Sequence, residues 1–259
     1  MQFEMTVLFL IAALVVGLLV TAELGRRLGL TRLREDPDGL PKGISASEGA
    51  VFALLGLLLA FTFSGAASRF EERRHLVTAE TNAIGTAYLR IDLLPEDARD
   101  DMRERFRRYV DARLETYSNV EDRAATAASL AEDEALQREI WTRAVSASLR
   151  PGVPTQAAML LLPALNEMID ITATRVAATR NHPPAVIFIL LVGLSLIGAL
   201  MVGYGTSVNR GRTWLHTVAF AAILSLTIYV IVDLEFPRLG LIRVDAADRA
   251  LVDLRASMK

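Results

Sequence analysis

The sequence predicts an all-α integral membrane protein, and three observations carry that prediction. Hydrophobic residues make up 52% of the 259 residues, yet 22% are charged, so the chain is neither a pure bundle of spans nor an ordinary soluble domain. A hydrocarbon core about 30 Å thick needs roughly 20 apolar residues as helix, and four segments provide such a run. No stretch alternates between apolar and polar residues as a half-buried strand does.

Four apolar segments are predicted to span the membrane. The first is interpreted as a retained span rather than a secretory signal, because its leading residues MQFEM are acidic and it is followed by Glu23, Arg26 and Arg27 instead of a small-residue cleavage site. The four predicted spans are about Val7 to Ala22, Gly49 to Ala67, Pro184 to Tyr204, and Trp214 to Val232.

The second span is predicted to continue beyond the bilayer as the same helix. Between Glu48 and Asn82 the apolar run turns directly into a charged sequence, with no proline and no turn cluster to end the helix. In an oligomer, such helices would line a path from the membrane into a soluble vestibule.

The region between the second and third spans is predicted to form a soluble helical domain. Proline followed by acids at Pro95-Glu96-Asp97 is typical of a helix start. Apolar residues then recur at helical spacing, and we expect a break over residues 118–122 and a loop at Pro151–Pro154. Further helices are predicted over Ala124–Leu149 and Ala157–Thr179.

The predicted organisation therefore has four segments. The first two spans and their loop occupy residues 1–67, and the helical domain occupies 68–182. The last two spans cover 183–233, and a C-terminal tail covers 234–259.

Small residues in the second and third spans predict close helix contacts, since they let backbones approach one another in lipid. Two interpretations stay open: the second-span face packs within one subunit, or it lines a pore in which leucine and phenylalanine side chains form an apolar constriction. The small residues are Gly49, Ala53, Gly56, Ala60, Ser64 and Gly65 in the second span, and Gly193, Gly198, Ala199 and Gly203 in the third.

Composition and motifs argue against an enzyme and against nucleic acid as a partner. The net charge is −2, and the absence of cysteine excludes disulfides and thiolate catalysis. The three histidines make no metal motif, and no phosphate loop or nucleophile elbow is present. Carboxylate runs such as Glu132-Asp133-Glu134 are expected on solvated helix surface. We therefore expect no catalytic residue, no metal site and no cofactor.

One segment resembles the second transmembrane helix of bacterial bestrophins. Residues 61–74 read FTFSGAASRFEERR and contain a phenylalanine followed by an Arg-aromatic-x-Glu-x-Arg pattern. The residues that carry this match are Arg69, Phe70, Glu72, Arg74, Leu76 and Asn82.

A second match follows the last span, where residues 233–244 read DLEFPRLGLIRV. This segment resembles the acidic, proline- and glycine-containing stretch of bestrophins, and resembles still more the ending of the bestrophin-like domain family. Its matching residues are Asp233, Glu235, Pro237, Arg238 and Gly240. The order of two spans, a helical region, two spans and a short tail agrees with both families.

The resemblance implies an ion channel. Bestrophins are pentamers whose second helices line a narrow hydrophobic neck, and many conduct chloride and other small anions. Carried over to this chain, the pore-lining candidates are Leu55, Leu59, Phe61, Thr62, Phe63 and Ser64. The expected partners are membrane lipid, further copies of the chain and small inorganic ions.

Two departures from the bestrophin pattern limit what the resemblance implies. Thr62 stands where many bacterial bestrophins have an arginine, so selectivity set by that charge does not carry over. Only Asp233 and Glu235 follow the last span before two arginines. The six or more oxygen ligands that a calcium ion needs are hard to assemble from these two acids. We therefore predict no calcium gate.

The alternative function is a membrane-anchored scaffold or signalling protein whose helical domain binds a partner. It differs from the channel in that side-chain changes between Leu55 and Ser64 are tolerated as long as packing survives.

The expected location is the bacterial inner membrane. Counting Lys and Arg in the two short loops between spans places those loops in the cytoplasm, whereas the resemblance places the helical domain and both termini there. We follow the resemblance for the orientation.

Overall fold

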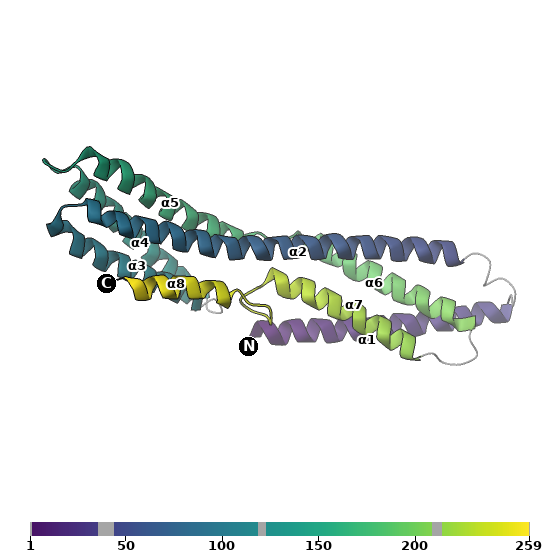
Figure 1. Cartoon of the computed structure of the whole chain (residues 1–259). Helices are drawn as coiled ribbons and strands as arrows, with labels where there is room; N and C mark the ends of the chain where they lie inside the picture. Colours follow the sequence, from purple (N-terminus) through teal and green to yellow (C-terminus); the bar gives the residue numbers. More distant parts are fainter. Residues whose placement is uncertain (1, 36–43, 119–122, 209–213, 259) are drawn as a thin grey trace. The chain divides into compact units, whose positions relative to one another are not determined.

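The computed structural model describes residues 2–35, 44–118, 123–208 and 214–258, and within these ranges the chain is all-α, as predicted. The chain divides into two compact units, one formed by residues 1–68 with 182–236 and the other by 69–181 with 237–259. The elements are α1 (Gln2–Glu35), α2 (Ile44–Leu89), η2 (Arg90–Leu93), α3 (Glu96–Ser118), α4 (Arg123–Ser148), α5 (Thr155–Arg180), α6 (Ala185–Gly205), η3 (Thr206–Val208), α7 (Trp214–Glu235) and α8 (Asp245–Ser257) (Figure 1).

The first unit contains the apolar helices. Among the described residues, four helical stretches are long and apolar enough to cross a membrane, and they fall on α1, on α2, on α5 with α6, and on α7. These are the four segments that the sequence predicts, and they indicate a multi-pass membrane protein. Of the basic residues between the spans that favour a cytoplasmic position for these loops, Arg26, Arg27, Arg32 and Arg34 lie in α1, and Lys42, Arg210 and Arg212 lie outside the described residues.

Within this unit α1 runs beside α6 and α7 (Figure 1). α1 and α6 approach closely because a glycine of each helix faces the backbone of the other. A Cβ at Gly25 would overlap the carbonyl of Leu200, and one at Gly203 would overlap the carbonyl of Ala22. The expected contact role of Gly203 is thus confirmed. The close contact at Gly25 of α1 was not predicted. Gly193, by contrast, has no atom within 4 Å of the position of a Cβ.

The prediction that the second span continues as one helix is confirmed, because α2 runs without a break from Ile44 to Leu89. Its first half belongs to the first unit and its second half, from residue 69, belongs to the second. Because the helix does not end near residue 69, the backbone N–H and C=O groups there are paired within the helix and need no capping side chains.

The second unit is a helical bundle around a continuous apolar core. α3 begins directly after Pro95, as predicted, and α5 begins after Pro154. Gly152 has a φ of 87°, which a glycine adopts readily in the Pro151–Pro154 loop. The predicted break after Ser118 falls mostly on 119–122, outside the described residues. The largest buried core side chains include Ile84, Ile91, Met102, Phe106, Tyr109, Ile140, Leu161, Leu165 and Met168.

The C-terminal tail joins this bundle. Leu251 of α8 and Met258, which directly follows that helix, belong to the same buried core as the helices of 69–181, and α8 packs on α3. The Arg255 guanidinium donates to both carboxylate oxygens of Asp111, at 2.7 and 2.9 Å. The segment 237–259 is therefore part of the second unit rather than a loose extension of the last span.

Candidate functional site

The first half of α2 has one face that packs within the chain. Phe52 meets Phe220 of α7 edge to face, with ring centroids 5.9 Å apart. A Cβ at Gly198 of α6 would lie 3.3 Å from Phe52 and 3.7 Å from Leu55, so both side chains rest on that glycine. Leu55 is 3% exposed. The expected contact role of Gly198 is therefore confirmed.

The six pore-lining candidates are distributed around the helix instead of sharing a face. Leu55 is covered by α6, and Leu59 and Thr62 are half-buried on the same side. Phe61 is 69% exposed and Phe63 is 44% exposed. Residues two positions apart on an α-helix point about 200° apart, so these two phenylalanines face opposite flanks. The six side chains therefore cannot all face one axis.

Ser64 belongs to a different set, the small-residue face of α2. This face lies opposite Leu55, because positions 53, 60 and 64 are rotated by roughly half a turn from position 55 at about 100° per residue. A Cβ at Gly49 or at Gly56 would have no atom within 4 Å. The small-residue face consists of Gly49, Ala53, Gly56, Ala60 and Ser64, all of them exposed in the chain.

Among the arginines just past the apolar half, Arg73 is the one the chain buries. Its guanidinium donates to the carbonyls of Ala178 and Asn181, at 3.2 and 3.1 Å, and so satisfies backbone groups at the end of α5. The motif arginine Arg74 is exposed and pairs with Glu71 at 2.9 Å. Phe70 and Arg69 are half-buried, and Glu72 and Asn82 are exposed.

The acidic pair after the last span is buried in the first unit. Asp233 and Glu235 are both nearly inaccessible. The His182 ring stacks on Phe236 at 4.6 Å, and its Nδ1 lies 3.5 Å from a carboxylate oxygen of Glu235. Across the described ranges, no group of three or more metal-ligating side chains gathers anywhere.

The motif residues that follow turn the chain at the start of the C-terminal segment of the second unit. The Val244 amide donates to the Pro237 carbonyl at 3.2 Å, and the Arg243 Nε donates to the Gly240 carbonyl at 3.0 Å. Arg238 binds both carboxylate oxygens of Asp248, at 2.9 and 3.0 Å. The turn thereby aligns α8 with a network of buried charges.

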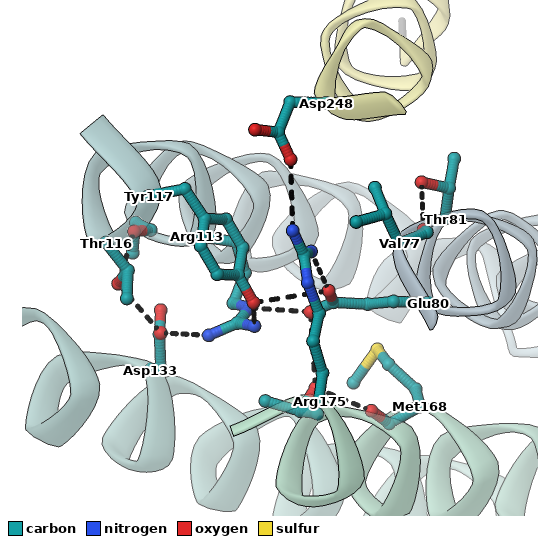
Figure 2. Close-up of polar contacts among 12 residues, drawn as sticks. Val77, Glu80, Thr81, Arg113, Thr116, Tyr117, Asp133, Met168, Arg175 and Asp248 are labelled. Carbon is teal, nitrogen blue, oxygen red and sulfur yellow. Dashed lines mark hydrogen bonds and ion pairs between the residues drawn. The ribbon is translucent and has the colours of Figure 1, made fainter. Parts of the chain in front are cut away.

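That buried ion network joins α2, α3, α4, α5 and α8 of the second unit, as Figure 2 shows for most of its members. Arg113 is fully buried, and its Nε donates to Glu80 and its Nη1 to Asp133, both at 2.7 Å. Arg175 binds the other oxygen of Glu80 and reaches Asp248 at 3.0 Å. With Arg238 included, three guanidiniums meet three carboxylates.

Tyr117 lies at the centre of this network. The guanidinium carbons of Arg113, Arg175 and Arg238 lie 4.7, 3.6 and 4.6 Å from its ring centroid, where the negative face of an aromatic ring attracts cations. Its hydroxyl contacts Glu80 at 3.4 Å and Arg113. The ring thus separates three like charges and lets them pack together.

Sequence reasoning missed this network, and one expectation about it is wrong. Glu132 and Glu134 are exposed as expected, but Asp133 is only 2% exposed because its side chain faces the bundle. A signal was present: Glu80 falls at the spacing of Leu76, Val77 and Ile84, which is the apolar face of its helix. A charge at an apolar-face position predicts a buried partner.

Burial changes the acid–base behaviour of Asp133, a member of the network, and of Tyr109 beside it. Burial raises the pKa of the Asp133 carboxyl, against the lowering effect of Arg113. Its Oδ1 has no hydrogen-bond partner among the described residues. Burial also raises the pKa of the Tyr109 hydroxyl to about 12, against the nearby charge of Arg113. That hydroxyl contacts Thr172 at 2.9 Å and accepts from Gln137 at 3.0 Å.

The Tyr109 shift predicts that the second unit loses stability in alkali. Since the pKa is higher in the folded state than the ordinary value of 10, the contribution is complete below pH 10 and disappears as pH rises through about 12. The loss amounts to about 2 to 3 kcal/mol. Thermal unfolding followed by circular dichroism between pH 8 and 12 measures it. Tyr109→Phe is expected to flatten this slope, and an equal flattening in Tyr88→Phe would contradict the assignment.

Comparison with models of protein families gives a match over most of the chain. The model of the bestrophin-like domain family matches residues 11–248, which covers α2, the buried ion network and most of the apolar helices. The chain matches no curated protein and no solved structure.

Proposed function

Since the chain belongs to the bestrophin-like domain family, we propose that it forms an oligomeric ion channel in the membrane, with the pore lined by the small-residue face of α2. The observation that carries this proposal is that the face is uncovered within one chain, while the opposite face of the same helix packs on α6 and α7. A helix with one face fixed by its own subunit has the other available for a central axis.

The chemistry of that face suits conduction. Small side chains leave room along an axis, and Ser64 adds a hydroxyl to an otherwise apolar surface. Leu57 and Phe61 are exposed on its flank and supply apolar groups of the kind that gate pores by dewetting. Small inorganic anions are the first ions to test, because the bestrophins that this family resembles conduct them.

The absence of cysteine in the natural chain makes a direct test possible. Ala60→Cys and Ser64→Cys place single thiols on the small-residue face. We expect a charged, membrane-impermeant thiol reagent to modify both in liposomes and to reduce anion flux several-fold, since a pore holds the water that a thiolate needs. Ala222→Cys, on an exposed side of α7, is the matched control and is expected to keep its flux.

If the reagent reduced the flux equally in the Ala222→Cys control, the assignment of α2 as the pore-lining helix would be contradicted. No flux from well-folded oligomers over a range of pH and voltage would favour the scaffold function. In that case the reagent is expected not to modify the thiols at positions 60 and 64, because lipid or a helix interface covers them.

A further inference from the structure

A pocket opens at one end of the apolar bundle, between the second half of α1, the end of α6 and the start of α7. Its empty volume is about 350 Å³, including the part open to the outside. All of its lining belongs to the first unit, where the apolar runs of the spans end. The lining residues are Leu19, Ala22, Glu23, Arg26, Gly203, Thr206, Trp214 and Thr217.

The pocket combines a cation with hydrogen-bonding groups. Arg26 is half-buried, and among the described residues its guanidinium makes no hydrogen bond or ion pair. Thr217 likewise has a hydroxyl without a partner in the described part of the chain, and it lies in the first turn of α7, whose amides favour an anion. These two groups present donors to the same space.

The pocket also holds one acid, Glu23. Its carboxylate accepts from Arg27 at 3.0 Å, and Arg27 is exposed outside the pocket lining. Glu23 and Arg26 both line the pocket, and they lie three residues apart on α1, a spacing that places them on the same helix face. The site thus offers one positive and one negative group side by side, rather than a purely basic surface.

We propose that this pocket binds the headgroup of a phospholipid that carries both a phosphate and a free ammonium, as phosphatidylethanolamine does. The phosphate accepts hydrogen bonds from Arg26 and the Thr217 hydroxyl, and the ammonium donates to Glu23. The source is a membrane lipid because the site sits where the apolar spans end and an interfacial tryptophan, Trp214, lines it. This inference does not depend on ion conduction.

Native mass spectrometry of the detergent-solubilised full chain, titrated with phosphatidylethanolamine or phosphatidylglycerol, tests the proposal. The wild type is expected to bind the ethanolamine lipid more tightly. Arg26→Gln is expected to weaken the binding of both lipids about tenfold, which is the effect of losing one charge-assisted hydrogen bond. Glu23→Gln is expected to abolish the preference between them. Thr217→Val provides a second variant, with a smaller loss for both lipids.

Arg34→Gln is the matched control, because it removes the same charge from an exposed position later in α1. An equal loss in Arg34→Gln, or no loss in Arg26→Gln, overturns the proposal. Inorganic phosphate at millimolar concentration is included as a competitor. Displacement of the lipid by phosphate alone would assign the pocket to a free anion and overturn the lipid assignment.

Discussion

Arg113→Met is expected to lower the free energy of unfolding of the second unit by about 3 to 5 kcal/mol. The arginine is fully buried and binds Glu80 and Asp133 at once. Its loss leaves Asp133 in the core with only a hydroxyl partner, Thr116, and burial of an uncompensated carboxylate is costly. Hydrogen–deuterium exchange of the full chain in detergent measures the effect in α3 and α4.

Arg138→Met is the control for this variant, because Arg138 is 72% exposed and its ion pair with Glu134 is long, at 3.7 Å. An exposed pair of this kind contributes less than about 1 kcal/mol. Combining Arg113→Met with Asp133→Asn is expected to restore part of the stability, since the unpaired charge is removed. If the amides of α3 and α4 exchanged at the same rate in Arg113→Met as in Arg138→Met, the network would not contribute to the stability of the second unit.

Leu251→Ala is expected to detach α8 from the second unit, at a cost of about 3 kcal/mol. Leu251 is fully buried in the core, and its truncation is expected to leave a cavity between α8 and the helices that it packs on. The expected result is loss of amide protection over Asp245–Ser257 and faster tryptic cleavage after Arg249. Protection in α4 and α5 is expected to persist, because the contacts of Arg113 with Glu80 and Asp133 do not involve α8.

Val252→Ala is the neighbouring control, since Val252 is 50% exposed and its truncation is expected to cost less than about 0.5 kcal/mol. Equal exchange in the two variants would mean that α8 is held by its ion pairs alone. Loss of protection throughout the second unit would mean instead that α8 is required for the whole bundle.

The spans and most helix limits could be predicted because they depend on local properties of the chain. An apolar run either matches the thickness of a bilayer or does not, and Pro95 and Pro154 restrict the backbone wherever they occur. The continuity of α2 follows in the same way, from the absence of any residue that would end it.

The side-chain environments could not be predicted in the same way. Asp133 and Glu134 are adjacent acids with similar propensities, yet one is buried and the other exposed. Their difference comes from the direction in which α4 faces α3, which rests on contacts distant in sequence. The pore candidates show the same limit, since Leu55 and Phe61 both belong to an apolar run but only Leu55 meets α6.

Three properties could be inferred from the amino-acid sequence alone: the helical class, four segments suited to a membrane, and the resemblance to the bestrophin-like family. Those properties depend on composition, periodicity and short motifs. Three other features are visible only in the folded chain: Gly25 meets α6, α8 belongs to the second unit, and Glu80, Arg113 and Asp133 share a buried network. The reason is physical: the free energy of a buried charge or a close backbone contact depends on the partner that folding brings to it.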